Sequence, residues 1–415
     1  MDFNFDEEID RTGTGSVKWA APSRLPANTM VRPLPMWIAD MDFRAPREVL
    51  DAIHRAVDHG IFGYDNPLPG FYESVVDWQR IRHQWAIKPE WIVLTPSVVA
   101  ALYYVIQTFS QPGDSVLMQM PVYRPFHLGP RINDRRVIGV PLEWDGHGYG
   151  LDPDRFRKAI APGTKLFILC NPHNPVGKVW SAEELRTMGE ICLEHGVLVV
   201  SDEIHQDFVL NREMRHIPFA GLGEEFAAHS IICTAPSKTF NLAGLRMSYT
   251  CISNPRLRTE LKRALERTGV HHPNSLGWIA CEAAYRKGAP WLDALLDYLR
   301  ANHALLAGTL ADSIPEIKVA PADSLYLAWL DCRALGMGAD ELNDFMLRDA
   351  GLCLNRGDEF GPGGEGHMRM NLACPRKVLK EALTRLQTAV EQWRAKRKTN
   401  AEGAKNAEEH SAKNQ

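Results

Sequence analysis

Four short polar motifs in this sequence supply an amine, carboxylates, amides and a histidine, the side chains that covalent and acid–base chemistry uses. Each motif follows a run of Val, Ile and Leu that suits a buried strand. The motifs are Thr95-Pro96-Ser97-Val98-Val99, Asn171-Pro172-His173-Asn174-Pro175-Val176-Gly177, Asp202-Glu203-Ile204-His205 and Thr234-Ala235-Pro236-Ser237-Lys238-Thr239-Phe240-Asn241. Because ligands of open α/β sheets gather beyond the carboxyl ends of the strands, we expect these residues to form one site.

Taken singly, each motif also has an ordinary structural explanation. A lone Ser-Lys pair is usually a solvated surface pair, and a lone aspartate at a strand end is more often a helix cap. Chemically, however, a lysine amine becomes a nucleophile where its site favours the neutral form. The helix opened by Ser97 offers free backbone N–H groups to a phosphate. The order and spacing of the four motifs are therefore more informative than any one of them.

Hydrophobic periodicity predicts the elements that must position these motifs. Short apolar runs indicate buried strands of a mostly parallel sheet, with helices between them. The clearest helix begins at Ser181, where Glu184 completes a capping box, and ends before Gly196. This alternation predicts a large doubly wound α/β domain, to which we assign residues 51–289. The predicted strands are Trp91–Thr95, Ser115–Met120, Val137–Pro141, Lys165–Cys170, Val197–Ser201 and Ile231–Thr234.

The two ends of the chain show a different pattern. Residues 1–50 contain a Pro-interrupted stretch, whereas residues 290–397 mix long amphipathic helices with short strands such as Leu325–Leu330. We predict that both ends combine into a second, smaller α+β domain. Residues 398–415 have almost no large apolar side chains, so we expect them to form a disordered tail. The predicted helices of the C-terminal part are Trp291–Leu310 and Val378–Arg394.

In their order and spacing the motifs resemble those of fold-type I enzymes that use pyridoxal 5′-phosphate (PLP), the aspartate aminotransferase superfamily. Within it they are most similar to the cystathionine β-lyase-like carbon–sulfur lyases. The resemblance covers almost the whole chain except the tail. Further segments that look like this branch are Gly13-Thr14-Gly15-Ser16-Val17-Lys18-Trp19, Pro35-Met36-Trp37-Ile38-Ala39-Asp40-Met41-Asp42-Phe43, Gly63-Tyr64-Asp65-Asn66-Pro67, Tyr326-Leu327-Ala328-Trp329-Leu330-Asp331 and Arg369-Met370-Asn371-Leu372.

The resemblance implies roles for the residues that would surround the PLP ring. Lys238 would hold the cofactor covalently and remove the Cα proton of an amino-acid substrate. Asp202 would pair with the pyridine nitrogen and keep it protonated. Asn174 would bind the phenolate oxygen, with His205 nearby at the position of a family tyrosine. Tyr123 would stack on the ring face.

The resemblance also implies a phosphate site, a substrate clamp and a second subunit. Arg369 would bind the substrate α-carboxylate through two parallel hydrogen bonds. Tyr64 is similar to a tyrosine that reaches the phosphate from the partner subunit, which predicts a homodimer with shared active sites. The predicted phosphate ligands are the backbone N–H groups of Ser97, Val98 and Val99, the Ser237 hydroxyl and Arg246.

The chemistry after removal of the Cα proton distinguishes the candidate reactions. Whole-chain similarity favours elimination from an L-cysteine S-conjugate such as cystathionine, which gives a thiol, pyruvate and ammonia. Arg246 resembles the phosphate arginine of aminotransferases, whereas Ala235 replaces a serine that is common in them. Transamination, or a specialised biosynthetic reaction on the same scaffold, is therefore the alternative. A non-catalytic PLP-fold regulator is a third class. Such regulators usually carry an added DNA-binding domain, and we expect none here because the resemblance already begins at residue 13.

Composition limits the partners and the compartment. The 415 residues carry a formal net charge of −4, which provides no electrostatic surface for nucleic acid or an anionic membrane. The eight cysteines are scattered and contain no C-x-x-C pair, so we expect buried reduced thiols and no metal site. The N-terminus is acidic where a signal peptide would be basic, and no apolar run is long enough to span a bilayer. We therefore expect a cytoplasmic enzyme.

Overall fold

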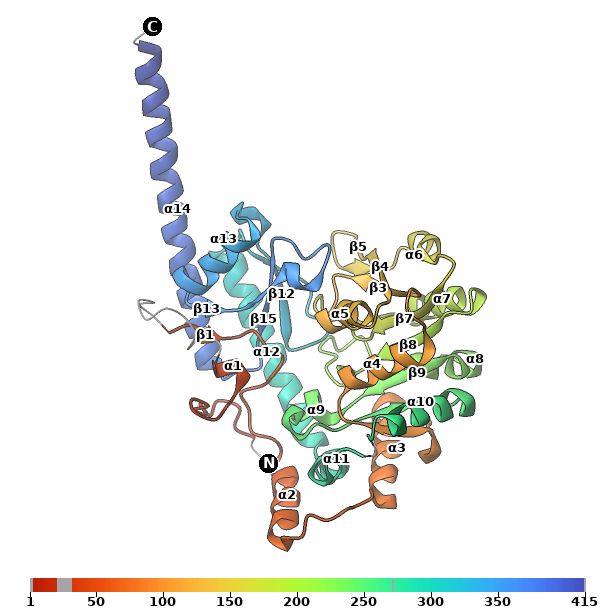
Figure 1. Cartoon of the computed structure of the whole chain (residues 1–415). Helices are drawn as coiled ribbons and strands as arrows, with labels where there is room; N and C mark the ends of the chain where they lie inside the picture. The colour runs from red at the N-terminus through yellow and green to blue at the C-terminus, as the bar shows by residue number, and fades with distance from the viewer. Residues whose placement is uncertain (1–2, 21–31, 271, 414–415) are drawn as a thin grey trace.

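The computed structural model describes residues 3–20, 32–270 and 272–413, and its largest element is a mixed seven-stranded sheet (Figure 1). The strand order is β2-β10-β9-β8-β7-β3-β4, and all neighbouring pairs are parallel except those of β10, which runs antiparallel to β2 and β9. The predicted α/β architecture is confirmed, and the six predicted strands are present within one residue at either end. The strands are β2 (Ile92–Thr95), β3 (Ser115–Met120), β4 (Arg136–Pro141), β7 (Thr164–Cys170), β8 (Leu198–Asp202), β9 (Ser230–Thr234) and β10 (Ser248–Cys251).

Helices cover both faces of this sheet, because alternate residues of each strand enter two different apolar clusters. In β7, Phe167 and Leu169 point into one cluster, whereas Leu166 and Ile168 point into the other. Helix α7 begins at the predicted capping box of Ser181 and Glu184. The helices around the sheet are α2 (Arg47–His59), α3 (Pro69–His83), α4 (Val98–Phe109), α5 (Arg124–Ile132), α6 (Pro153–Ala159), α7 (Ala182–Glu194), α8 (Glu224–Ala228), α9 (Pro236–Thr239), α10 (Pro255–Arg267) and α11 (Ser275–Lys287).

A second, four-stranded antiparallel sheet has the order β11-β12-β15-β14 and packs with C-terminal helices around its own apolar cluster. The N-terminal segment joins this part of the molecule, since β1 (Leu34–Pro35) pairs with β13 (Leu352–Cys353) and Met36 lies in the same cluster. A further small ribbon pairs β5 (Glu143–Trp144) with β6 (Tyr149–Gly150). The remaining elements are α1 (Val17–Ala20), α12 (Ala289–Ser313), β11 (Lys318–Val319), β12 (Leu327–Asp331), α13 (Ala339–Asp344), β14 (Asn355–Arg356), β15 (His367–Asn371) and α14 (Arg376–Lys413).

The prediction of a disordered tail from residue 398 differs from the structure, in which α14 continues to Lys413 and projects from the body of the molecule (Figure 1). The lack of large apolar side chains argues against packing but not against a helix. Ala, Glu and Lys dominate this stretch and have high helix propensity, and extending an existing helix requires no new nucleus. Among the described residues, no helix combines the length and apolar character needed to cross a membrane.

Candidate active site

The carboxyl ends of the parallel strands bring the polar motifs together at one edge of the large sheet. The strand register places Cys170 opposite Asp202, and Asp202 opposite Cys233. The turn after β7 carries Asn174, and the turn after β9 leads into α9, which carries Lys238. Sequence order alone therefore led to the correct edge, because parallel strands must share it.

Lys238 is half-buried and has one hydrogen bond, which its Nζ donates to the carbonyl oxygen of Ala39 over 2.6 Å. Burial and the nearby Arg369 cation together lower the pKa of Lys238 to about 8, against the opposing effect of Asp40 and Asp202. At pH 8 about half of such an amine is neutral, compared with under about 1% at the ordinary pKa. The site therefore favours the nucleophilic and basic form of this amine.

Asp202, at the end of β8, is a buried carboxylate with few partners. Its Oδ1 accepts one hydrogen bond, from the backbone N–H of Ile204 at 3.1 Å, and its Oδ2 has no partner among the described residues. Burial, with a smaller effect of the Glu203 charge, raises the pKa of Asp202 to about 7 against the opposing effects of the Ile204 hydrogen bond and the Lys238 charge. A buried carboxylate in this state fits a cationic N–H donor such as a protonated pyridine nitrogen.

Arg369, on β15, points its guanidinium at the same edge. Its Nη1 donates to Asn174 Oδ1 at 3.0 Å, and its Nη2 donates to Asn355 Oδ1 at 2.6 Å. Its Nε is buried and has no partner within the described residues. Burial lowers the pKa of Arg369 to about 10, so it remains a cation at neutral pH. An incompletely paired buried cation fits an anionic ligand such as a carboxylate.

Two aromatic side chains complete this group. The backbone N–H of Tyr123 donates to the backbone carbonyl of Asn174 at 3.1 Å. Burial raises the pKa of the Tyr123 hydroxyl, the Arg369 charge opposes this rise, and the Asp202 charge adds to it. His205 is buried, and its Nδ1 has no partner in the described part of the chain. Burial and the charges of Lys238 and Arg369 lower the pKa of His205, so its ring is neutral.

The predicted phosphate ligands meet where β2, β9 and β10 adjoin. Ser97 caps α4 by accepting from the Ala100 N–H at 3.1 Å, which leaves the first N–H groups of the helix, at Val98 and Val99, without an intrahelical acceptor. Arg246 immediately precedes β10, whose Ser248 lies opposite Thr95 of β2, and its side chain pairs with no described residue. Ser237 lies in α9, next to Lys238. This cluster of free donors fits a phosphate dianion.

Tyr64 is the one predicted residue that its own chain does not bring to the site. It lies on the loop between α2 and α3, and its side chain is fully exposed. The types and spacing of residues in one chain do not predict which loop contacts a second copy of that chain.

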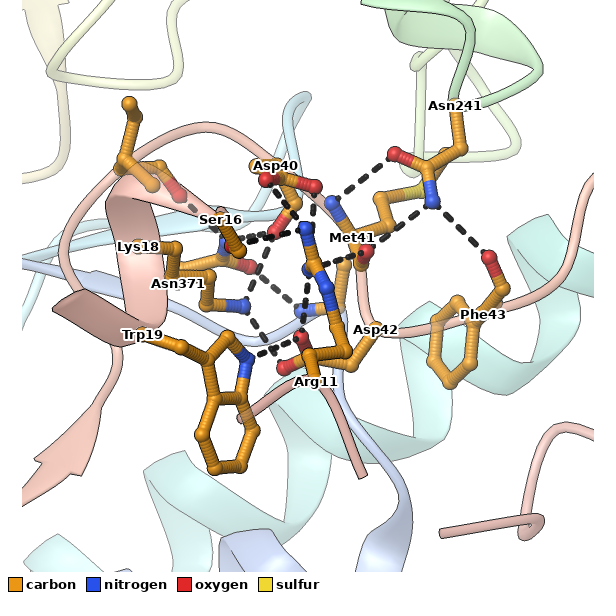
Figure 2. A network of polar contacts seen from close by, with 12 residues as sticks. Arg11, Ser16, Lys18, Trp19, Asp40, Met41, Asp42, Phe43, Asn241 and Asn371 are labelled. Atoms are coloured by element: carbon orange, nitrogen blue, oxygen red, sulfur yellow. Dashed lines mark hydrogen bonds and ion pairs between the residues drawn. The ribbon is translucent and has the colours of Figure 1, made fainter. Parts of the chain in front are cut away.

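Sequence reasoning missed the segment that receives the Lys238 amine, residues 38–43. Figure 2 shows the polar network that holds it: Arg11 bonds to Asp40 at 2.8 Å and to Asp42 at 3.0 Å. The buried Lys18 pairs with Asp42 at 2.6 Å. The backbone of this segment is bonded by the side chains of Asn241 and Asn371 (Figure 2). The motif around Asp40 was visible as a family resemblance, but its contact with Lys238 was not.

Comparison with known proteins agrees with this geometry. The family described as aminotransferase class I and II matches residues 38–386. Cystathionine beta-lyase PatB of Bacillus subtilis is 44% identical over 389 residues, which cover 93% of this chain and all of PatB. The crystal structure of cystalysin from Treponema denticola, which contains PLP, superposes with a TM-score of 0.92 at 34% identity, covering 94% of this chain and all of cystalysin.

Another solved structure, the PLP-bound C-S lyase from Staphylococcus hominis, has a TM-score of 0.87 at 33% identity and covers 94% of this chain and 98% of that lyase. The aspartate aminotransferase of Geobacillus stearothermophilus matches at 26% identity over 84% of this chain and 89% of its own length. On these matches and the site that accompanies them, the chain belongs to the PLP-dependent aminotransferase class I and II family, within its carbon–sulfur lyase branch.

Proposed function

We propose that this enzyme catalyses β-elimination of L-cysteine S-conjugates of the cystathionine type, consuming one water and giving a thiol, pyruvate and ammonia. The observation that carries the proposal is the 44% identity to a cystathionine β-lyase over nearly the whole chain. The lower identity to aspartate aminotransferase, 26%, supports elimination over transamination.

The residues of this chain divide the work. Arg369 binds the substrate α-carboxylate and so fixes the orientation of the Cα–H bond. Lys238, neutral in part because of its burial and the Arg369 charge, takes the Cα proton on Nζ. Asp202 would accept a hydrogen bond from the ring nitrogen of bound PLP and stabilise its proton. Bound PLP supplies the electron sink that makes this proton acidic and lets the Cβ substituent leave.

The leaving group explains why a sulfur substituent suits this site. A thiol has an ordinary pKa of about 8.5, so a thiolate leaves without prior protonation far more readily than an alkoxide.

His205 is held neutral, and it therefore places no positive charge beside Lys238 that would oppose proton uptake.

We expect purified enzyme given L-cystathionine to release pyruvate and a thiol in equal amounts without any added keto acid. Lactate dehydrogenase coupling measures the pyruvate, and a thiol reagent measures the second product. L-Alanine, which has no leaving group on Cβ, serves as the matched control and should give no pyruvate in the absence of a keto acid. Turnover that depends on an added keto acid and yields no thiol would instead support an aminotransferase.

We further propose that two chains form a homodimer with shared active sites. The α2–α3 loop exposes Ile61, Phe62 and Leu68 around Tyr64, an apolar group that an isolated surface rarely presents. The Tyr64 hydroxyl would then contribute to the phosphate site of the partner subunit.

Sedimentation is expected to give the mass of two 46.6-kDa chains. Tyr64→Phe, which removes only the hydroxyl, should speed PLP dissociation by about 10- to 150-fold, as expected for the loss of one hydrogen bond to a charged group. A single-chain mass, or unchanged PLP release in this variant, contradicts the shared site.

A further inference from the structure

A buried acidic network lies next to α9, on residues that the proposed reaction does not use. Asp207 is 4% exposed, and its two carboxylate oxygens accept separate hydrogen bonds. Its Oδ1 accepts from His83 Nε2 at 2.9 Å, and its Oδ2 accepts from the hydroxyl of Thr239 at 2.7 Å. Thr239 directly follows Lys238, so this carboxylate is bonded to the element that carries the reactive amine.

A second buried pair supports the first. Glu203 directly follows Asp202 and accepts from His216 Nε2 at 2.9 Å, and the rings of His216 and His83 meet edge to face with centroids 5.4 Å apart. The Nδ1 atom of His216 is buried without a partner among the described residues. The His83 ring is therefore packed against a second buried ring, which restricts its movement.

The charge state of this network favours a fixed geometry. Burial lowers the pKa of His83, whereas the hydrogen bonds of His83 and Thr239 hold the pKa of Asp207 below its ordinary value in spite of burial. A neutral histidine thus donates to an ionised carboxylate, which in turn accepts from a hydroxyl. Hydrogen bonds to a buried ionised acceptor are stronger than neutral ones.

The element that this network anchors is short, and its other side-chain hydrogen bonds come from Asn241, just beyond its end, to the segment 38–43. Helix α9 spans only four residues, and no side chain caps its N-terminus. The Lys238 amine has one hydrogen bond, to the Ala39 carbonyl, in a place where burial and Arg369 oppose its positive charge. A lysine held less firmly would move toward solvent, where the charged form is favoured.

We propose that Asp207, fixed by His83, is a positioning residue. Through its hydrogen bond with the Thr239 hydroxyl, it holds the Lys238 amine where burial and Arg369 disfavour the protonated form. The groups that face the Lys238 amine and shift its pKa are Arg369, Asp40 and Asp202. Asp207 is not one of them, so it acts by positioning the Lys238 amine and not through the electrostatic field of its own charge. The proposal rests on the role of Lys238 as the residue that carries PLP.

The test is the pH dependence of the absorbance of bound PLP in the holoenzyme, with thermal unfolding measured in parallel. In Thr239→Val, which removes the hydroxyl at nearly constant size, the titration midpoint should rise by about one pH unit, because the relaxed nitrogen regains its proton more easily. Thr239→Ser keeps the hydroxyl and should return the wild-type midpoint. Asp207→Asn should also raise it.

The matched control is Thr250→Val. Thr250 is equally buried, in β10, and its hydroxyl bonds to the Val93 carbonyl at 3.4 Å, away from the Asp207 network. This variant loses the same group and should keep the wild-type midpoint, whatever happens to its melting temperature. A merely structural role for Asp207 would lower the stability of Thr239→Val without moving the midpoint.

The proposal is overturned by an unchanged midpoint in Thr239→Val, by an equal shift in Thr250→Val, or by a band that does not titrate in either protein. Persistence of the wild-type band in Lys238→Ala would instead remove the role of Lys238 itself. If only the proposed role of Asp207 were wrong, the absorbance band would still depend on Lys238, but its titration would not respond to substitution of Thr239.

Discussion

Lys238→Ala should lose pyruvate release by at least about 10⁴-fold, since general-base catalysis alone contributes roughly 10²–10⁴-fold and covalent attachment of PLP is lost as well. The groups that shift the pKa of this amine, an arginine and two carboxylates, cannot replace a primary amine in covalent attachment of PLP. Steady-state pyruvate release with L-cystathionine, normalised to PLP content, measures the effect.

Covalent attachment gives a second readout for the same variant. Borohydride reduction of wild-type holoenzyme, followed by peptide mapping, should label the peptide that contains Lys238, and the variant should remain unlabelled there. Lys262→Ala, an exposed lysine of α10, is the control and should keep both activity and labelling. Wild-type activity in Lys238→Ala, or label on another lysine, would refute the assignment of the site.

Arg369→Ala should reduce kcat/KM for L-cystathionine by about 10- to 150-fold, which corresponds to the roughly 1.5–3 kcal/mol of a hydrogen bond to a charged group. The reason is geometric, since only a guanidinium presents two parallel donors to a carboxylate. Arg369→Lys keeps the charge but not the paired donors, so we expect it to recover part of the loss.

The controls for Arg369 separate binding from folding. Arg256→Ala removes an exposed arginine of α10 that pairs with Glu260 at 3.0 Å, and it should leave kcat/KM unchanged. Because Arg369 is buried and bonded to Asn174 and Asn355, the melting temperature and PLP content of its variants must be measured alongside. An unchanged kcat/KM in folded, PLP-loaded Arg369→Ala would mean that another residue holds the substrate carboxylate.

The sequence predicted those elements whose physical cause is local. Strand β3 was found with its true ends because it is buried on both faces and reads as a short, mainly apolar run. Strand β10 was missed because Ser248, Tyr249 and Thr250 do not form such a run. Its burial depends on partners distant in sequence, such as the Thr95 hydroxyl, which lies 2.7 Å from the Ser248 hydroxyl.

The same distinction applies to the site. The edge at which Lys238 and Asp202 lie could be predicted because Asp202 ends strand β8 and Lys238 lies in the short helix after strand β9, so topology alone decides the edge. The Trp37 carbonyl that accepts from Arg369 and the Ala39 carbonyl that accepts from Lys238 lie 332 and 199 residues away along the chain, and no spacing rule relates them. The residue types in the motifs indicated the candidate reacting groups. The residues that hold those groups in place became apparent only in the folded structure.

Arg11 and Lys18 form ion pairs with Asp40 and Asp42, which hold the N-terminal residues against the segment 38–43. The Ala39 carbonyl of this segment accepts the hydrogen bond of the Lys238 amine. Proteolytic trimming that removes both Arg11 and Lys18 is therefore expected to release that segment, and the result would be measurable as loss of PLP from a protein that is otherwise folded. Anyone attaching an affinity handle or a fluorescent partner should choose the outer end of α14, which projects from the body, and leave the beginning of the polypeptide unaltered.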